Sequence, residues 1–378
     1  MDNLEVSIVM PCLNEEKGIV ICLNKIKEVF MKEHINGEII IADNGSIDRS
    51  RAICEEAGAR VFIEPIPGYG SAYLRGLKEA RGQYIVIADS DNTYDFSDIP
   101  EFLKVLKSGY DFVIGSRFKG KIKHGAMPWV NRYIGNPILS GMTRLFFRSR
   151  LSDIHCGMRA FTAEAYRKMN LRTPGMEFAT EMVVAALTNN LRTKEIPINY
   201  HPRYGDSKLA PFYDAWRHVR FMLLYCPLWL YFIPGLVGFL PGIFFLLFLS
   251  GGPVIFLGHY WDIHFLIFFS ALTILSYQVM SLGVFAHVFA INEGFIKEDR
   301  LISLFRRKFN LEKGLIIGIV LFVIGFGINL LIFMEWFSNH FGALYRIRES
   351  VLALTLLVIG VQTIFGSFFI SLLTFKKR

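Results

Sequence analysis

The sequence predicts a soluble α/β domain with a mostly parallel sheet, followed by an all-α membrane domain of four helices. Three observations lead to this fold class. Apolar, β-rich runs alternate with helical patterns in residues 1–210, whereas residues 231–378 contain four long apolar runs. The chain of 378 residues is also 52% hydrophobic and contains 35 Phe, which is more apolar than an ordinary soluble protein.

The prediction for residues 1–210 rests on the order of the elements. Strands are expected at 6–11, 38–43, 59–64, 84–89 and 111–116, with helices near 15–33, 46–57, 70–80 and 98–108. Strands that are apolar throughout and alternate with helices predict a parallel sheet covered on both faces. Ligands of such sheets bind beyond the carboxyl ends of the strands.

The membrane domain, residues 231–378, is predicted from length and composition. Its spans are expected at about 231–250, 264–290, 314–334 and 351–374, each close to the ~20 residues that cross a bilayer. Aromatic and basic residues mix in the segment 211–230, and apolar residues share one face of about 295–309. Both segments are expected to form amphipathic helices at the membrane interface, although a plain connector stays open for the second.

Charge predicts the orientation of this integral membrane protein. The chain carries six Lys and Arg between the second and third spans and none between the first and second. Basic loops stay inside, and the N-terminus has no signal-peptide pattern, so the soluble domain and both termini are expected in the cytoplasm. The net charge of +8 is then explained by anionic lipid headgroups rather than by nucleic acid.

Polar residues follow several predicted strands at one edge of the sheet. The first strand runs into Pro11–Glu16, the second into Asp43–Ser46, the fourth into Asp89–Asp91 and the fifth into Gly115–Arg117. A helix cap is the simpler explanation for Asn14 and for Ser46 taken singly. Together the residues predict a binding site.

Asp89 and Asp91 are two residues apart and are expected on one side of an extended segment. Two close carboxylates repel each other, and a divalent cation such as Mg²⁺ or Mn²⁺ relieves the repulsion and chelates a diphosphate. A hydrolytic acid–base pair is the alternative. The Gly-rich turn at 67–76 lacks the dinucleotide and P-loop patterns, so either a close approach to a ligand or a plain turn explains it.

As a set, these motifs resemble family 2 glycosyltransferases with a GT-A fold, and more narrowly the polyprenyl-phosphate glycosyltransferases. The narrower group comprises dolichyl-phosphate mannose synthases and their dolichyl- or undecaprenyl-phosphate glucosyl relatives. The matching segments within residues 4–210 are SIVMPCLNEE (7–16), ADNGSIDRS (42–50), PGYGSAYLRGL (67–77), DSD (89–91), GSR (115–117), SDIHCGMRAF (152–161) and RYGDSKL (203–209).

The resemblance implies roles for individual residues. The nucleotide sugar would be held by Pro11, Asn14, Glu15, Asp43, Ser46, Gly70, Asp89, Ser90, Asp91, Arg203 and Lys208. The metal, Mg²⁺ or Mn²⁺, would bind Asp89 and Asp91, and the acceptor phosphate would bind Arg117, Arg132 and Ser207. Catalysis would depend on Asp91, Asp153, Arg117 and Arg203. Thr93 stands where mannose synthases often have Gln, so the third metal ligand and the sugar stay open.

The implied reaction is an inverting transfer of a hexosyl group from a nucleotide sugar, such as UDP-glucose or GDP-mannose, to a polyprenyl phosphate in the bilayer. The acceptor phosphate is anionic near neutral pH, so Asp153 is either a weak base or a turn residue. His155 and Cys156 are adjacent and are expected to point apart, which argues against a nucleophile pair. The alternatives are a processive polysaccharide synthase, a nucleotidyltransferase and a non-catalytic scaffold or lipid-transport subunit. A homo-oligomer is compatible with each.

Overall fold

The computed structural model describes residues 4–205, 211–292 and 310–374. The chain divides into two compact units, Met1–Met222 and Leu223–Arg378. The division therefore lies inside the segment 211–230, for which the sequence predicts an interfacial helix. Each unit is described by itself.

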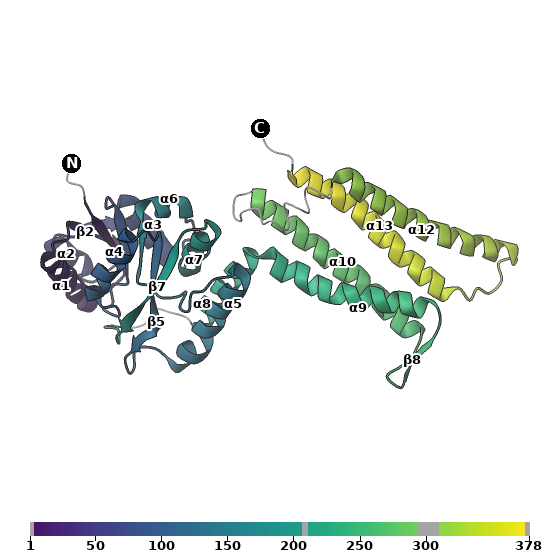
Figure 1. The fold of residues 1–378 in the computed structure, drawn as a ribbon, viewed down its shortest axis with the longest axis horizontal. Helices are drawn as coiled ribbons and strands as arrows, with labels where there is room; N and C mark the ends of the chain where they lie inside the picture. Colours follow the sequence, from purple (N-terminus) through teal and green to yellow (C-terminus); the bar gives the residue numbers. More distant parts are fainter. Residues whose placement is uncertain (1–3, 206–210, 293–309, 375–378) are drawn as a thin grey trace. The chain divides into compact units, whose positions relative to one another are not determined.

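The first unit is built on a seven-stranded sheet (Figure 1) with the order β3-β2-β1-β4-β6-β5-β7. Its strands are β1 (Val6–Cys12), β2 (Gly37–Asp43), β3 (Arg60–Ile63), β4 (Tyr84–Ile87), β5 (Phe112–Ile122), β6 (Arg159–Thr162) and β7 (Thr193–Tyr200). Only β6 runs against its neighbours, β4 and β5, and the other pairings are parallel. The predicted α/β class with a mostly parallel sheet is confirmed.

The last two strands, β6 and β7, were not predicted from the sequence. The strand β6 reads RAFT and contains only two apolar residues, Ala160 and Phe161, so it does not form an apolar run. In β7, buried and exposed residues alternate and Pro197 interrupts the apolar run, as an edge strand permits.

Helices connect and cover the strands of this unit. They are α1 (Glu16–Lys32), α2 (Ser50–Glu56), α3 (Tyr69–Glu79), α4 (Ile99–Lys107), α5 (Asn136–Phe147), α6 (Ala163–Met169), α7 (Phe178–Thr188) and α8 (Pro211–Leu224), with the short turns η1 (Phe96–Asp98) and η2 (Asn131–Gly135).

The cap positions of α1 and α2 are Glu15 and Arg49. Helix capping by Asn14 or Ser46 is therefore wrong as an explanation of those two residues.

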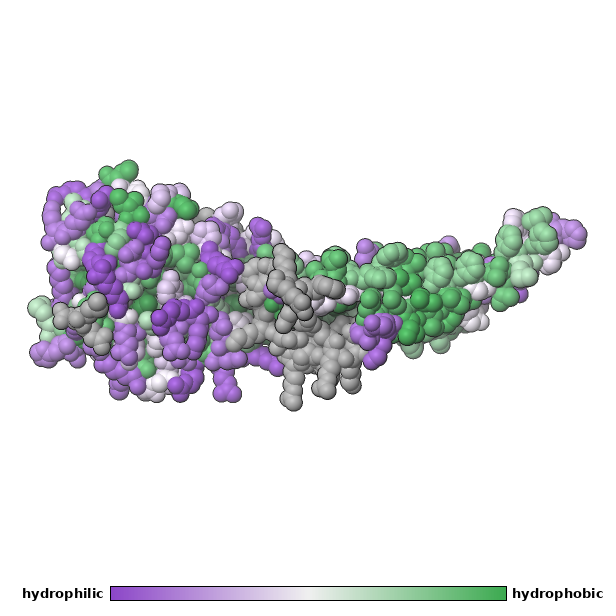
Figure 2. Space-filling model, turned by 90° about the horizontal axis from the view of Figure 1, so that it is seen from above, coloured by the Kyte–Doolittle hydropathy of each residue, from purple (hydrophilic) through white to green (hydrophobic). Residues whose placement is uncertain are grey.

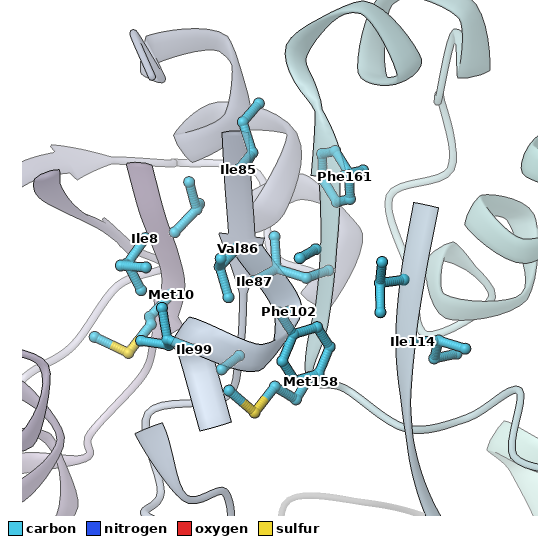
Figure 3. Packing of buried hydrophobic residues seen from close by; sticks show 14 of the residues in the cluster. Ile8, Met10, Ile85, Val86, Ile87, Ile99, Phe102, Ile114, Met158 and Phe161 are labelled. Carbon is cyan, nitrogen blue, oxygen red and sulfur yellow. The ribbon is translucent and has the colours of Figure 1, made fainter. Parts of the chain in front are cut away.

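Residues on β1 alternate between the two faces of the sheet, so apolar side chains of this strand pack against helices on both faces. Ile8 and Met10 join one buried cluster with Ile99 and Phe102 of α4 (Figure 3). On the opposite face, a Cβ added to Gly76 of α3 would lie 2.5 Å from Val9 Cγ1. The missing side chain thus lets α3 pack closely on β1.

The Gly-rich turn before α3 is explained by a close approach within the chain. A Cβ on Gly70 would lie 2.1 Å from the Thr173 carbonyl oxygen, and one on Gly68 would lie 2.2 Å from the Pro174 carbonyl oxygen. Glu181 of α7 holds this segment by accepting hydrogen bonds from Thr173 N–H and Oγ1, at 2.9 and 2.6 Å. A ligand contact at Gly70 stays a prediction.

Among the described residues of the second unit, four helices are long and apolar enough to cross a membrane. They are Leu228–Ser250 (η3, Leu228–Phe232, continued by α9, Ile233–Ser250), α10 (Ile263–Asn292), α12 (Leu311–Ser338) and α13 (Ile347–Thr374). A two-stranded ribbon, β8 (Val254–Phe256) and β9 (His259–Trp261), separates α9 from α10. Hydrophobic residues cover the visible surface of these helices (Figure 2). The four predicted helices are confirmed, while the predicted loop helix at 295–309 lies outside the described residues.

Small and hydroxyl residues join the long helices. A Cβ on Gly318 of α12 would lie 2.9 Å from the Gly360 carbonyl oxygen of α13, so these two backbones approach closely. A hydrogen bond of 2.7 Å between the Ser270 and Thr355 hydroxyls connects α10 to α13. Such contacts are typical of helices that pack within a bilayer, where apolar burial alone gives little driving force.

We expect Gly70→Ala to destabilise the first unit by about 1–3 kcal/mol, because a methyl group there collides with backbone rather than with a movable side chain. The control is Gly141→Ala on α5, where the nearest atom to an added Cβ lies 3.9 Å away. Thermal unfolding of the full chain in detergent measures both variants. Equal unfolding midpoints would contradict the packing explanation of Gly70.

Candidate active site

The loops that follow β1 and β2 are tied together by side-chain hydrogen bonds. Asn14 N–H donates to Ser46 Oγ at 3.0 Å, and Ile47 N–H donates to Asn14 Oδ1 at 2.8 Å. Asn14 itself has a φ of 53°, in the left-handed region that Asn tolerates. Asp43 accepts from Ser46 N–H at 3.3 Å, so the predicted nucleotide-binding residues of these two loops lie together.

The carboxylates of Asp89 and Asp91 lie in a loop, because β4 already ends at Ile87. The strand period therefore does not set their positions, and that step of the prediction is wrong. Asp89 Oδ1 accepts hydrogen bonds from the Tyr69 and Tyr73 hydroxyls at 3.0 and 3.3 Å. Burial and, to a lesser extent, the negative charge of Asp91 raise the pKa of Asp89 to about 6.

Asp91 is buried, and its two carboxylate oxygens have different partners. Oδ1 accepts from Thr93 N–H at 3.1 Å and from Thr93 Oγ1 at 2.6 Å. Oδ2 lies 3.2 Å from Nη2 of Arg203, and the same nitrogen lies 3.4 Å from Glu15 Oε1. Arg203 therefore bridges a carboxylate of the first loop and one of the Asp89–Asp91 pair. Ser90 ties the same loops by donating to the Pro11 carbonyl oxygen at 2.7 Å.

The donor set at Asp89 and Asp91 fits a hard divalent cation. Both residues offer carboxylate oxygens, and their mutual repulsion is relieved by a positive ion. Among the described residues, no group of three or more His, Cys, Asp or Glu side chains could hold a metal ion. Two carboxylates suit Mg²⁺ or Mn²⁺, because Mg²⁺ is usually held by one or two protein carboxylates together with waters and phosphate oxygens.

A second cluster is formed by Arg117 at the end of the apolar part of β5 and Asp153. The Arg117 Nε and Nη2 atoms each donate to Asp153 at 2.7 Å, and the Arg117 backbone N–H donates to it at 3.0 Å. Both side chains are buried. Burial disfavours the charge of Arg117, yet the opposite charge of Asp153 outweighs it and holds the pKa of Arg117 well above its usual value.

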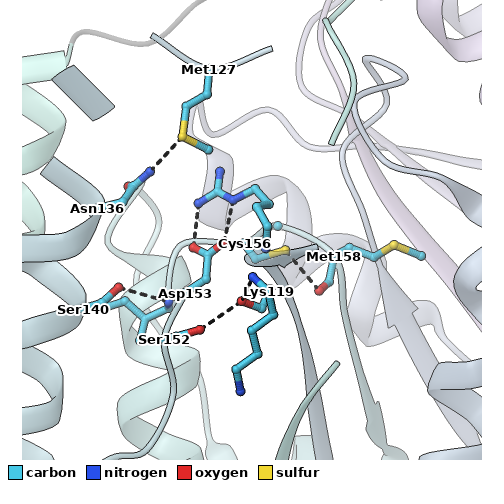
Figure 4. Close-up of polar contacts among 12 residues, drawn as sticks. Lys119, Met127, Asn136, Ser140, Ser152, Asp153, Cys156 and Met158 are labelled. Atoms are coloured by element: carbon cyan, nitrogen blue, oxygen red, sulfur yellow. Dashed lines mark hydrogen bonds and ion pairs between the residues drawn. The ribbon is translucent and has the colours of Figure 1, made fainter. Parts of the chain in front are cut away.

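Glu195 on β7 fixes the segment that carries Asp153, and sequence reasoning missed it. Its Oε1 accepts from Ser152 N–H, Ser152 Oγ and Asp153 N–H, each at 2.9 Å. Its Oε2 lies 2.6 Å from Lys119 Nζ. Figure 4 shows Asp153, Ser152 and Lys119 gathered at this point. Because β7 was not predicted, no local pattern placed Glu195 near Asp153.

Aromatic residues connect the two clusters. The Arg117 guanidinium lies 5.2 Å from the centre of the Tyr200 ring, and the Tyr200 and Tyr94 rings are 5.5 Å apart. Gly157 N–H donates to the Tyr94 hydroxyl at 2.7 Å, and a Cβ on Gly157 would lie 2.6 Å from Asp89 Oδ2. The pKa of Tyr200 is raised to about 12, mainly by burial, and it also responds to the charges of Arg117, Asp91 and Asp89.

The remaining predicted residues are placed elsewhere or not described. Arg132 lies on η2 with its guanidinium 5.3 Å from the Tyr133 ring. Ser207 and Lys208 lie outside the described residues. Burial raises the pKa of Cys156 to about 12, so this residue is a thiol rather than a thiolate at neutral pH. His155 instead lies near Thr180, with 3.4 Å between Nε2 and Oγ1, which argues further against a His155–Cys156 nucleophile pair.

We expect Asp153→Ala to lower the free energy of unfolding by about 3–5 kcal/mol, because it leaves the buried charge of Arg117 uncompensated. Arg51→Ala serves as the control, since it breaks an ion pair with Glu55 whose side chains are 50% and 52% exposed. That control should change stability by no more than about 1 kcal/mol. Chemical unfolding of the full chain measures both, and equal small effects would contradict the paired burial of Arg117 and Asp153.

Two family models match the chain. The model described as glycosyl transferase family 2 matches residues 7–170, and that of the glycosyltransferase family 2 C-terminal transmembrane region matches residues 284–374. The low-salt glycan biosynthesis hexosyltransferase Agl6 of Haloferax volcanii is 38% identical over 96% of this chain and 87% of its own length. The dolichyl-phosphate hexose transferase of the same organism is 30% identical over 55% of this chain and 88% of its own length.

Among solved structures, the chain is similar to glucosyl-3-phosphoglycerate synthase from Mycobacterium tuberculosis, in a complex with Mn²⁺, UDP and glucosyl-3-phosphoglycerate. The identity is 20%, the coverage is 59% of this chain and 80% of that chain, and the TM-score is 0.48. The assignment rests instead on the similarity to Agl6, which extends over nearly the whole chain, and on the two family models. The chain belongs to glycosyltransferase family 2.

Proposed function

We propose that the protein transfers a hexosyl group from a nucleotide sugar to a membrane polyprenyl phosphate, with inversion at the anomeric carbon. The observation that carries this proposal is the Asp89–Asp91 pair with Arg203 beside it, beyond the carboxyl ends of parallel strands. Carboxylates that suit a divalent cation and a nearby guanidinium are complementary to a sugar diphosphate. The hexosyltransferase and dolichyl-phosphate hexose transferase relatives support the sugar class and the acceptor class.

The proposed donor site lies between the first two loops and the carboxylate pair. The base and ribose are assigned to Pro11, Asn14, Glu15, Asp43 and Ser46, with Gly70, Ser90 and Lys208 assigned to the sugar diphosphate. When the donor binds, Arg203 would leave Asp91 and Glu15 and bind the diphosphate instead. The two carboxylates share a single nitrogen of Arg203, Nη2, so neither holds the guanidinium alone. A bound Mg²⁺ or Mn²⁺, held by Asp89 and Asp91, would neutralise charge on the departing nucleoside diphosphate.

The proposed acceptor site lies at Arg117, with Arg132 and Ser207 assigned to the same phosphate. A phosphate oxygen is already anionic near neutral pH and needs no strong base to attack the anomeric carbon. Asp153 is bound to Arg117 through two hydrogen bonds, so we assign it a positioning role through that guanidinium. Attack opposite the leaving diphosphate gives the inverted configuration.

A lipid acceptor is supported by an apolar surface on the first unit itself. We call it the aromatic surface, and its exposed side chains on and beside η2 and α5 are Trp129, Val130, Tyr133, Ile134 and Ile138. Arg132 lies among these apolar residues, and the exposed Arg144 follows them on α5. Helix α8 packs against α5, with 3.1 Å between Thr143 Oγ1 and Met222 Sδ, and also exposes Tyr213 and Trp216. Exposed aromatic residues mixed with basic ones are typical of surfaces that lie on anionic lipid.

The same proposal assigns residues 1–210 to a cytoplasmic catalytic domain, 211–230 to the interface and 231–378 to the bilayer, with both termini cytoplasmic. The segment 251–262 between α9 and α10 contains no Lys or Arg, which supports an outer position for that connection. Catalysis would then take place on the side of the membrane where nucleotide sugars are made.

We expect transfer of radiolabelled sugar from one nucleotide sugar to polyprenyl phosphate, dependent on Mg²⁺ or Mn²⁺ and abolished by chelator. Asp91→Asn should reduce this transfer by ~100-fold or more, because the variant loses one of the two carboxylate charges assigned to the divalent cation. The control is Asp95→Asn, where the amide can still accept the Ser97 N–H hydrogen bond. The product is measured by organic extraction. Metal-independent transfer would contradict the donor site, and a polymeric product would favour a processive synthase.

Replacing Trp129 and Tyr133 together by Ser should raise the apparent KM for polyprenyl phosphate in vesicles by about tenfold or more. Each side chain contributes about 1.5–3 kcal/mol when it is buried in an apolar phase. The KM for the nucleotide sugar should not change. Met31→Ser is the matched control, because Met31 on α1 is 70% exposed and lies outside the aromatic surface. Equal acceptor kinetics in both variants would contradict the role of this surface.

A further inference from the structure

We propose that Tyr69 and Tyr73 are positioning residues that fix the Asp89 carboxylate for binding a divalent cation. This inference rests on the assignment of Asp89 and Asp91 as the cation-binding pair. The sequence did not predict either tyrosine as a site residue, and of the PGYG turn it predicted only Gly70. Both hydroxyls donate to the same atom, Asp89 Oδ1, at 3.0 and 3.3 Å.

Helix α3 brings the two phenols to one place. Tyr69 and Tyr73 are four residues apart, so they lie on the same side of the helix, one turn above the other. Their rings meet edge to face with centres 4.9 Å apart, and the Tyr73 ring stacks on Phe178 of α7 at 5.5 Å. Tyr73 is fully buried. The packing leaves the two hydroxyls little freedom to turn away from Asp89.

The Gly-rich turn explains why Tyr69 is held so firmly at the very start of α3. Gly68 and Gly70 have no side chains, so the Thr173–Pro174 segment lies directly on this end of the helix. Ser71 N–H donates to the Pro174 carbonyl oxygen at 3.0 Å and fastens the first turn. The glycines therefore serve the site indirectly, by letting a second loop clamp the helix that presents the phenols.

Asp89 and Asp91 differ in the charge of the groups that contact their carboxylates. Neutral phenols fix the orientation of the Asp89 carboxylate without cancelling its charge, so that a cation can still be attracted to it. Asp91 is instead paired with Arg203, whose positive charge must be exchanged for the metal. Because both phenols bind Oδ1, Oδ2 is the oxygen of Asp89 that would bind the ion. Hydrogen bonds to a ligating carboxylate commonly set the affinity of a metal site.

The test is Mn²⁺ binding by the full chain in detergent without any nucleotide, measured from the electron paramagnetic resonance signal of free Mn²⁺. Tyr69→Phe and Tyr73→Phe each remove one hydroxyl and keep the ring. We expect each to weaken Mn²⁺ binding by about 10–100-fold, with an unchanged midpoint of thermal unfolding. Asp89→Asn gives the reference for a lost site. Tyr166→Phe is the matched control, since Tyr166 packs against Phe161 at 6.3 Å in the core.

Wild-type affinity in both tyrosine variants, with affinity lost in Asp89→Asn, would overturn the inference, as would a wild-type chain that binds no Mn²⁺. Tyr69 is only partly buried, so Tyr69→Phe decides the question if Tyr73→Phe does not fold. The measurement needs no sugar donor and no lipid. Weaker Mn²⁺ binding in the variants of a chain that transfers nothing to polyprenyl phosphate would support the inference and refute the proposed acceptor.

Discussion

The buried guanidinium of Arg159 is the interaction on which the arrangement of this site depends. Arg159 opens the single antiparallel strand and donates to the carbonyl oxygens of Cys156, Ile154 and Ala179 at 2.8, 2.8 and 2.6 Å. Burial lowers the pKa of Arg159, which shows the cost of holding a charge there. These hydrogen bonds join α7 to the loop from Asp153 to Gly157. That loop in turn pairs with Arg117 at one end and packs against Asp89 at the other.

Charged side chains in the first unit are neutralised in two ways. One is a buried ion pair that stabilises the fold, and the other is a shared contact that a ligand can replace. Asp153 and Arg117 are buried together, and removing one of them would leave the other as a charge without solvent. The carboxylate pair is only partly neutralised, because Arg203 shares one nitrogen between Glu15 and Asp91. The buried ion pair thus holds the Arg117 guanidinium in one position, while Arg203 is held more weakly and can change partners when a ligand binds.

Features typical of membrane-associated proteins are found both in the four long helices and on the first unit. The helices of the second unit satisfy their backbone groups internally and use small residues for contact, as a bilayer demands. The first unit has a conventional apolar core, and η2, α5 and α8 expose apolar side chains, among them the aromatic Tyr133, Tyr213 and Trp216. The proposed lipid acceptor would use such a surface, because its phosphate would stay at the level of the headgroups.

The sequence by itself determined the α/β class, five of the seven strands, the four apolar helices and the polar residues beyond β1, β2 and β4. These features depend on local periodicity and on runs of apolar residues, which can be read along the chain. Only the tertiary structure decided that Arg117 pairs with Asp153, that Glu195 fixes this loop, and that Tyr69 and Tyr73 hold Asp89. Those partners lie 36, 42, 20 and 16 residues apart. Sheet order and the antiparallel insertion of β6 bring them together, and no local pattern encodes which distant strands become neighbours.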